Sequence, residues 1–355
     1  MEQFAFLVHP LDINDVAKKY RLATKVSPKV VASILRRRRP FVIAEIEGIR
    51  SLTGVQAVGW FIAVPLLPWQ LLQLEEEYVL EKLAKAVKVA KKQGAKIVGL
   101  GAYTAIPGNG GQKLAQLVDL PITTGNTYTT ATAIDSTLLA CQEMEIKPEK
   151  AVLAVVGATG SIGQACATIL APRFQKVILV GRDFEKLNQL QKAIQELNPQ
   201  TQATTNIKEI KKAEVVITVT SAVSAIIQPE DLKSGAVVCD VARPRDVSAI
   251  VSQVRDDVLV IDGGIVKPPG EVNFNLDFGP PPGLCEGCIG ETIILALEKR
   301  YESYTLGKNI TLEMVKEMNE LAAKHGFSLA GLRRFEKMLT KEEIEAVKQR
   351  ALAKT

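Results

Sequence analysis

Short runs of apolar residues alternate with longer amphipathic stretches along most of this chain. In its central part the apolar runs have the length of single strands, and the segments between them show the three- and four-residue spacing of amphipathic helices. Strands that alternate with helices are typical of a parallel sheet covered by helices on both faces. The pattern therefore predicts a doubly wound parallel α/β sheet, with strands at 151–156, 176–180, near Ala203, and at 215–221, 236–240 and 258–262.

The first 130 residues predict a separate α/β region. His9 ends a predicted strand over 4–10, where it is expected to hydrogen-bond to backbone, and a charged amphipathic helix is expected over 75–93, where Gly94 would end it. A helix over 131–146 would lead into the parallel sheet. The remaining strands are expected as a pair around the turn Leu52–Gly54, at 41–46 and 54–63, and as a single strand at 96–101.

The C-terminal part predicts a loop followed by helices. Residues 267–282 are rich in Pro and Gly and predict a long functional loop, after which helices are expected over 291–304 and 311–325, with a charged helical tail. The predicted organisation is an N-terminal α/β substrate domain (1–130), a Rossmann-type dinucleotide-binding domain with its linker helix (131–288), and C-terminal helices that pack back on the body (289–355).

A glycine motif follows the first strand of the predicted parallel sheet. In such a motif the first glycine permits a tight turn, the second lets the backbone approach a pyrophosphate, and the third lets the helix pack close to the strand. The start of the helix then offers amide groups to the phosphates. The predicted dinucleotide site comprises Gly157, Ala158, Thr159, Gly160, Ser161, Ile162 and Gly163.

The residues after the second strand bear on which dinucleotide is bound. Gly181 is followed by Arg182, and a guanidinium suits the 2′-phosphate of NADP. Asp183 leaves NAD possible as the cofactor, but we expect NADPH. Further cofactor contacts are expected where other strands of the sheet end, because ligands bind at the carboxyl ends of parallel strands. These residues are Thr220, Ser221, Asp240, Arg243, Gly263 and Gly264.

Composition and charge narrow the class of protein. The chain has 355 residues, 47% of them hydrophobic, and a net charge of +5, with no basic stripe interleaved with aromatic residues, so nucleic acid is not expected as a partner. There is no pattern of a signal peptide, and the apolar stretch 57–67 is too short for a membrane span, so a cytoplasmic location is expected. The run Arg36–Arg39 fits a solvated helix end or a docking patch for an acidic partner.

Two of the five cysteines lie three residues apart, at Cys285 and Cys288. A zinc site would need two more ligands at suitable spacing, which the sequence does not offer, so no metal is expected. A redox dithiol and a catalytic thiolate remain open. We favour Cys288 as a nucleophile, because amides in the first turn of a helix lower the pKa of a thiol, although Glu291 would act the other way if close.

A polar cluster precedes the helix predicted at 131–146. Thr123, Thr124 and Asn126 surround Gly125, and composition alone fits both a capped helix start and a site that positions a carbonyl or nicotinamide. A thiol beside a nicotinamide cofactor implies attack on an activated acyl carbon, reduction of the enzyme thioester by hydride, and release of an aldehyde. Thr124 and Asn126 are the predicted donors to the developing oxyanion.

Several collinear segments between residues 4 and 327 resemble the long-chain fatty acyl-[acyl-carrier-protein] reductases that form fatty aldehydes. The segments Thr123–Thr127 and Gly307–Thr311 are more specific than the glycine motif. The other resembling segments are Phe6–Asp12, Gly101–Ile106, Val155–Gly163, Cys288–Glu291 and Lys324–Phe327. A weaker likeness, through the nucleotide domain and Asp240–Asp246, runs to the glutamyl-tRNA reductase and shikimate dehydrogenase group.

The resemblance implies NADPH-dependent reduction of a long-chain acyl thioester, with Cys288 as the acyl-accepting residue. The donor could be acyl carrier protein or acyl-CoA. Two alternatives stay open: an NADP oxidoreductase of the shikimate dehydrogenase or glutamyl-tRNA reductase kind that acts on another carbonyl, and a module that senses NADPH without turnover.

Overall fold

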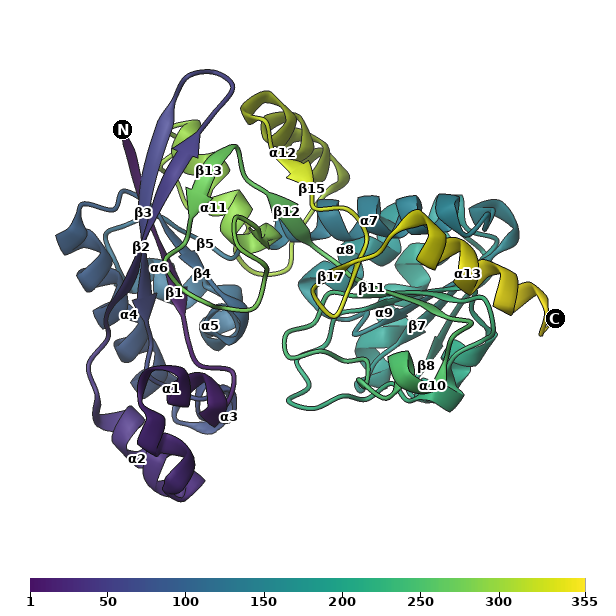
Figure 1. Cartoon of the computed structure of the whole chain (residues 1–355), viewed down its shortest axis with the longest axis horizontal. Coiled ribbons are helices and arrows are strands. Elements are labelled where there is room, and N and C mark those ends of the chain that lie inside the picture. The colour runs from purple at the N-terminus through teal and green to yellow at the C-terminus, as the bar shows by residue number, and fades with distance from the viewer. Residues whose placement is uncertain (355) are drawn as a thin grey trace. The chain divides into compact units, whose positions relative to one another are not determined.

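The computed structural model describes residues 1–354, which fold into two compact units. Unit 1 contains residues 1–126, 266–309 and 318–328, and unit 2 contains residues 127–265, 310–317 and the chain from 329 onward. The sequence had predicted boundaries at 130 and 288. Both units are layered α/β structures (Figure 1), which confirms the predicted fold class.

Unit 2 is built on a six-stranded sheet in which every neighbouring pair of strands is parallel. Its order is β11-β10-β9-β6-β7-β8, so the chain reverses direction across the sheet between β6 and β9, as in the Rossmann arrangement. The strands are β6 (Val152–Val156), β7 (Lys176–Val180), β8 (Thr201–Thr204), β9 (Val215–Thr218), β10 (Val237–Asp240) and β11 (Leu259–Asp262).

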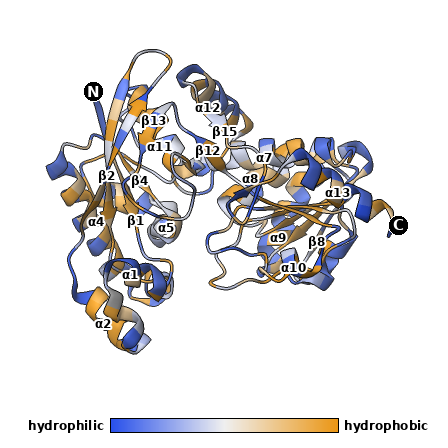
Figure 2. Cartoon of the chain, viewed as in Figure 1, coloured by the Kyte–Doolittle hydropathy of each residue, from blue (hydrophilic) through white to orange (hydrophobic). Residues whose placement is uncertain are grey.

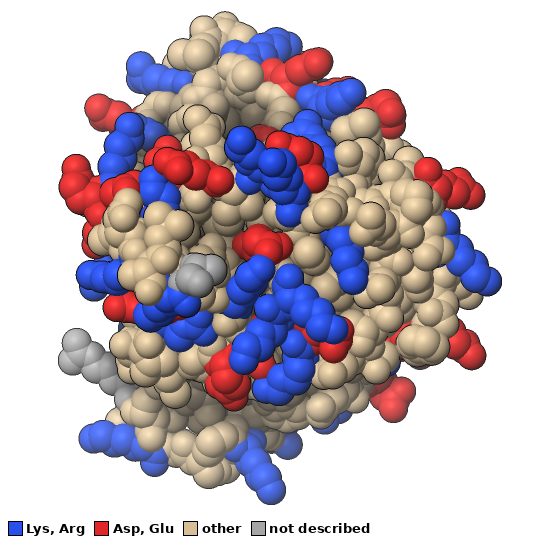
Figure 3. Space-filling model, turned by 90° about the vertical axis from the view of Figure 1, so that its right-hand side faces the viewer, with Lys and Arg blue, Asp and Glu red and all other residues tan. Residues whose placement is uncertain are grey.

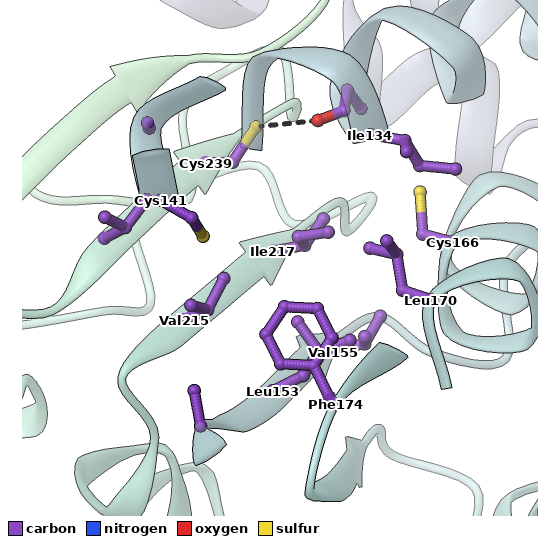
Figure 4. Packing of buried hydrophobic residues seen from close by; sticks show 14 of the residues in the cluster. Ile134, Cys141, Leu153, Val155, Cys166, Leu170, Phe174, Val215, Ile217 and Cys239 are labelled. Atoms are coloured by element: carbon purple, nitrogen blue, oxygen red, sulfur yellow. Dashed lines mark hydrogen bonds between the residues drawn. The ribbon is translucent and has the colours of Figure 1, made fainter. Parts of the chain in front are cut away.

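Each face of this sheet has its own core, because side chains alternate along a strand. Leu153 and Val155 point into one core, and Ala154 and Val156 into the other. Figure 4 shows the first core, where Cys141, Cys166 and Cys239 lie among apolar side chains. The helices assigned to this unit are α7 (Asn126–Glu143), α8 (Ser161–Leu170), α9 (Phe184–Gln195), α10 (Val251–Val254) and α13 (Lys341–Leu352).

Unit 1 is built on a mixed six-stranded sheet with the order β13-β2-β3-β1-β4-β5. Helices α4 (Glu76–Gln93) and α11 (Gly287–Leu297) cover opposite faces: Leu7 and Leu100 point toward α4, whereas Gly99 faces α11. The strands are β1 (Glu2–Val8), β2 (Phe41–Arg50), β3 (Gln56–Ala63), β4 (Val98–Leu100), β5 (Ile122–Thr123) and β13 (Gly270–Asn273).

Short helices and turns complete the chain. Helix α12 (Leu312–His325) ends at the residue that the sequence predicted, and Gly326, which follows it, has a φ of +92°. The other helices are α1 (Ile13–Lys19), α2 (Pro28–Arg37), α3 (Pro68–Gln73), α5 (Pro107–Gly110) and α6 (Gln112–Leu117). The remaining strands are β12 (Ile265–Lys267), β14 (Cys285–Glu286), β15 (Ser328–Leu329), β16 (Arg333–Arg334) and β17 (Lys337–Met338).

Several predicted boundaries were wrong. The segment 267–282 is not only a loop, because β13 pairs with β2 there, where Gly48 and Gly270 bring the two backbones together: a Cβ on Gly48 would lie 2.0 Å from the Glu271 carbonyl oxygen. The helix expected over 131–146 spans Asn126–Glu143, and the helix expected over 291–304 spans Gly287–Leu297. Both corrections place predicted site residues inside helices.

Candidate functional site

Cys288 lies in the first turn of α11, directly after Gly287. The residues of this helix are almost all apolar and buried, because the helix packs on the sheet of unit 1 so closely that a Cβ on Gly99 would lie 2.1 Å from the Thr292 hydroxyl. Within α11, all of which the structure describes, Cys288 is the one residue that is not buried. A buried helix therefore has a single partly exposed residue, a cysteine, at its start.

Gly125 packs directly against Cys288. Its φ is +72°, and a Cβ at this position would lie 2.2 Å from the Cα and 2.3 Å from the Cβ of Cys288. The structure thus brings the polar segment 123–126 into contact with the cysteine, although 163 positions in the sequence separate Gly125 from Cys288. Any side chain at position 125 would displace one of the two segments.

A buried carboxylate connects the two segments. Glu291, one helical turn after Cys288, accepts hydrogen bonds from the hydroxyls of Thr123 at 2.5 Å and Thr305 at 2.9 Å. The Thr123 hydroxyl oxygen in turn accepts from the Gly125 amide at 3.2 Å. Glu291 therefore fixes the loop that contacts the thiol, a role that sequence reasoning missed, together with Thr305. The spacing of three residues between Cys288 and Glu291 was the available signal.

The structure places the two predicted oxyanion donors differently. Thr124 is buried and donates its hydroxyl proton to the Thr305 carbonyl at 2.5 Å, so this proton is committed to holding the loop. Asn126 is partly exposed and is the first residue of α7. Of the two side chains, Asn126 is the one whose exposure suits contact with a ligand.

The acidity of Cys288 differs from the sequence expectation. Burial raises the pKa of its thiol, and the nearby carboxylates of Glu286 and Glu291 raise it further. The amides of Ile289 and of Cys288 itself act in the opposite direction but do not prevail. The expectation of a lowered pKa was wrong because burial, together with the carboxylates of Glu286 and Glu291, outweighs the amides at the start of the helix. The resting group is a thiol, which has to lose its proton during attack on a substrate.

The other cysteines are buried and inert. Burial raises the pKa of Cys141 and of Cys239 to about 12, and it also raises the pKa of Cys166 and Cys285. Cys285 precedes α11 on the short strand β14 and is fully buried. Among residues 1–354, no group of His, Cys, Asp and Glu side chains could hold a metal ion.

His9 is a satisfied histidine at the end of β1. Its Nδ1 lies 3.0 Å from the Pro10 carbonyl oxygen, to which it donates, and its Nε2 accepts from the Tyr103 amide at 3.2 Å. Burial lowers the pKa of His9 to about 4, so the ring is neutral at pH 7. This confirms the expectation of a backbone-bonded residue.

The glycine turn of unit 2 has the geometry that a dinucleotide requires. Gly157 has a φ of +82°, and a Cβ on Gly163 would lie 2.3 Å from the Gly157 carbonyl oxygen, so this third glycine lets α8 approach the turn. A Cβ on Gly160 would meet only the Gly157 oxygen, at 3.3 Å, which leaves open space beside the backbone. The first turn of α8, where Ser161 and Ile162 lie, presents amide groups toward a phosphate in such a turn.

Arg182 and Asp183, which follow β7, have different surroundings. Asp183 caps α9 by accepting from the Lys186 amide at 3.1 Å, and it also pairs with the Lys186 ammonium at 2.6 Å. Arg182 is exposed beside it. The acid that kept NAD open is thus engaged within the protein, while the guanidinium is accessible to a ligand.

The residues at the other strand ends organise loops. Asp246, whose role sequence reasoning missed, is fully buried. It accepts from the hydroxyls of Thr218 and Thr220, each at 2.6 Å, and from the Thr220 amide at 2.9 Å. Asp240 accepts from the amides of Ala242 at 3.1 Å and Val247 at 2.9 Å. Burial raises the pKa of Asp240 to about 6, against the opposing effect of Arg243.

The remaining predicted cofactor residues lie nearby in unit 2. Arg243 donates to the Ala242 carbonyl at 2.8 Å, and Ser221 is exposed. Gly263 has room for no side chain, since a Cβ there would lie 2.6 Å from the Cys239 sulfur, and Gly264 has a φ of +80°. These residues lie close together at the carboxyl end of the sheet, which is the end where ligands of such sheets bind.

Residues 139–262 match the family model described as shikimate/quinate 5-dehydrogenase. Together with the parallel sheet and the glycine turn, this match gives the chain the dinucleotide-binding domain of a nicotinamide-dependent oxidoreductase. No helix within residues 1–354 has the length and apolar character needed to cross a membrane.

Two curated relatives are similar along most of the chain. Aminotransferase PigE of a Serratia species is 28% identical over 363 residues, which cover 98% of this chain and 42% of PigE, so the chain spans less than half of that relative. The long-chain acyl-[acyl-carrier-protein] reductase of Synechococcus elongatus is 27% identical over 305 residues, which cover 81% of this chain and 87% of that protein. Among solved structures, the L-tryptophan dehydrogenase of Nostoc punctiforme has a TM-score of 0.43 at 12% identity, covering 100% of this chain and 89% of that one.

Proposed function

We propose that the protein reduces a long-chain acyl thioester to the aldehyde, with NADPH as the reductant and Cys288 as the acyl acceptor. The observation that carries this proposal is the partly exposed Cys288 at the start of the otherwise buried helix α11, in contact with Gly125. The similarity to the Synechococcus reductase along 81% of the chain supports the substrate class.

The reaction proceeds in two balanced stages. In the first, the Cys288 sulfur attacks the acyl carbon, and the thiol of the acyl carrier leaves with the proton that Cys288 gives up. NADPH, when bound, supplies a hydride to the resulting acyl-enzyme. In the second stage the oxyanion of the thiohemiacetal takes up one proton from water and the carbon–sulfur bond breaks, which releases the aldehyde and restores the Cys288 thiol.

The surrounding residues position these steps. The Asn126 amide and the amides of the first turn of α11 are the proposed donors to the oxyanion. Thr124 holds the loop through the Thr305 carbonyl, and Glu291 holds it through the Thr123 hydroxyl. Both are positioning residues in this proposal.

Residues of unit 2 support NADPH as the cofactor. The residues of the turn, from Gly157 to Gly163, would hold the pyrophosphate, and Arg182 would hold the 2′-phosphate of NADPH, since Asp183 is engaged as a helix cap. Thr220, Ser221, Asp240, Arg243, Gly263 and Gly264 stay proposed contacts at the sheet edge.

The test is intact mass after incubation with a long-chain acyl-[acyl-carrier-protein] or acyl-CoA, first without and then with NADPH. We expect a mass increase of one acyl group, mapped to Cys288, which is lost as aldehyde when NADPH is added. Cys288→Ser should give no thioester, and Cys285→Ser, the matched control in the same segment, should keep the adduct because Cys285 is buried. An adduct absent with both donors would contradict the proposal.

A second candidate is a carbonyl oxidoreductase of the shikimate dehydrogenase kind, which the match over residues 139–262 favours. This reaction transfers hydride directly and needs no cysteine. NADP-dependent oxidation of hydroxy acids that survives in Cys288→Ser would support it. Tight NADPH binding without turnover of thioesters or carbonyl compounds would point instead to a sensing module.

A further inference from the structure

The positive charge of this chain is concentrated in one segment. Between Asp15 and Glu45 the sequence contains nine Lys and Arg residues and no Asp or Glu. The net charge of the whole chain is only +5, so the residues outside this segment are together net negative. A segment so different from the rest of the chain is an electrostatic feature in its own right.

The segment folds into a group of short helices at one end of unit 1, formed by α1, the 3₁₀ turn Arg21–Lys25, and α2, against which α3 packs (Figure 1). We call this group the basic lobe. Val31 and Leu35 bury one side of α2 in a small core with Leu67, and Gln70 of α3 donates to the Ala32 carbonyl at 3.1 Å. The lobe is therefore a folded part of unit 1.

The exposed side of α2 carries two apolar residues beside its cations. Val30 and Ile34, one turn apart on the helix, have exposed fractions of 48% and 59%, and the preceding residues Leu22 and Val26 have 69% and 38%. Figure 2 shows hydrophobic and hydrophilic stretches side by side on the ribbon of α2. Tyr20 and Trp69, amphipathic rings of the same lobe, are also partly exposed, at 37% and 43%.

The cations around these aliphatic side chains are not neutralised. Lys25, Lys29, Arg37 and Arg39 are exposed and form no ion pair with any residue in the part of the chain that the structure describes. By contrast, the face in Figure 3 carries basic and acidic side chains side by side. Ion pairs such as Lys354 with Asp256, at 2.9 Å, are usual elsewhere in the chain.

We propose that the basic lobe binds the surface of an anionic lipid bilayer. Exposed aliphatic side chains between Lys and Arg residues are the pattern of a segment that places its apolar side among the headgroups while its cations bind lipid phosphates. The partly exposed rings of Tyr20 and Trp69 also favour a position at the level of the headgroups. The lobe lies on the bilayer and does not span it, because the ten residues of α2 extend only about 15 Å.

A bilayer suits this surface better than an acidic protein does, since insertion of Val30 and Ile34 among lipids needs no complementary pocket on a partner. The inference does not depend on the proposed reductase activity. A cysteine variant without activity should bind bilayers as the unmodified chain does.

The test is co-sedimentation of the full chain with vesicles of phosphatidylcholine alone or of phosphatidylcholine and phosphatidylglycerol in equal parts. We expect binding to the anionic vesicles only, weakened by salt. The double variant Lys29→Gln/Arg37→Gln should weaken it about 25-fold, because each cation near the surface contributes about fivefold. Val30→Ser/Ile34→Ser should weaken it about tenfold at unchanged charge.

The matched control is Lys85→Gln/Lys91→Gln on α4, which removes the same charge from unit 1 at lysines that already pair with Glu81 and Asp119. Unchanged binding by this control supports the basic lobe as the site. Equal binding to both kinds of vesicle, or equal loss in the control, would overturn the proposal. So would absent vesicle binding together with weaker binding of acyl carrier protein by the lobe variants, which would identify an acidic protein as the occupant.

Discussion

At the scale of single residues, the contact between Gly125 and Cys288 is the most demanding feature of the site. Gly125→Ala would place a methyl group 2.2 Å from the Cys288 Cα at a φ of +72°. We expect this variant to lose most thioester formation and to unfold more easily than the unmodified chain. The measurements are acyl-enzyme mass and urea denaturation.

Gly54 offers the matched control for this prediction. It has a φ of +85° but no atom within 4 Å of the position that an alanine methyl group would take, so Gly54→Ala carries the backbone cost alone, about 1–2 kcal/mol. Gly125→Ala should cost more than Gly54→Ala, and only Gly125→Ala should remove activity. Equal losses would show that the approach to Cys288 is unimportant.

Asp240 gives a second prediction, on pH. Its pKa is raised from 3.8 to about 6 in the folded protein, so the folded state binds the proton more tightly than the unfolded state. Its contribution to stability therefore falls as pH rises from about 4 through about 6, and from pH 5 to 7.5 it changes by about 1 kcal/mol.

Asp240→Asn retains an oxygen that accepts from the Val247 amide but cannot ionise. We expect the difference in unfolding free energy between pH 5 and pH 7.5 to shift by about 1 kcal/mol relative to the unmodified chain. Urea denaturation of both proteins at both pH values measures it. An identical pH dependence would mean that Asp240 is charged throughout this range.

Sequence alone pointed to Cys288 and the segment 123–126 as candidate site residues, but not to the contacts that connect them. Cys288 and the segment 123–126 were predicted as a thiol and its polar neighbours, and the structure brings them together. The link through Glu291 and Thr305 was missed, because Thr123 lies 168 positions before Glu291 and no spacing rule relates them. The direction of the Cys288 pKa shift was also not predictable. It depends on how deeply the thiol is buried, and residue types do not report burial.

At the scale of elements, the end of α12 is anchored to the turn between β2 and β3. His325 is fully buried, with Nδ1 at 2.7 Å from the Ser51 hydroxyl and Nε2 at 2.5 Å from the Glu298 carboxylate. The Leu52 amide donates to the His325 carbonyl at 3.0 Å. Burial lowers the pKa of His325, although Glu298 opposes that effect.

His325→Ala should therefore destabilise the protein by about 2–3 kcal/mol, because it removes a buried ring together with its hydrogen bonds to the Ser51 hydroxyl and the Glu298 carboxylate. Lys324→Ala, the neighbouring control, removes an exposed ammonium that lies 2.6 Å from the same Glu298 carboxylate and should cost under about 1 kcal/mol. Denaturant unfolding distinguishes the two. Similar small losses in both variants would mean that the anchor is dispensable.

Most elements were predictable, and the wrong boundaries have physical causes. The strands of the parallel sheet appear as apolar runs because both faces are buried. The start of helix α7 was predicted too late because its first turns are rich in Thr, a poor helix former. These residues are nevertheless helical, and Thr132 donates its hydroxyl proton to the Tyr128 carbonyl at 2.8 Å. Strand β13 was not predicted, because the Pro and Gly residues around it hide the sequence pattern of a strand. Its backbone nevertheless pairs with β2.

At the scale of the whole molecule, cofactor binding should be visible as stability. A ligand that binds only the folded state at 100 times its Kd adds about 2.7 kcal/mol. We expect NADPH to raise the melting temperature more than NADH at the same concentration, and Arg182→Ala to remove most of that difference. Lys186→Ala, at the next exposed cation, should preserve the difference between NADPH and NADH. An equal rise in melting temperature with both cofactors would contradict the proposed contact with Arg182.

The state of Cys288 has a consequence for how the protein withstands oxidants. Peroxide attacks the thiolate, and a thiol that retains its proton is oxidised slowly. Because burial and two carboxylates raise the pKa of Cys288, the resting protein carries the one partly exposed residue of α11 in the protected form. Such a protein should keep this sulfur intact through oxidising episodes for as long as Cys288 stays protonated.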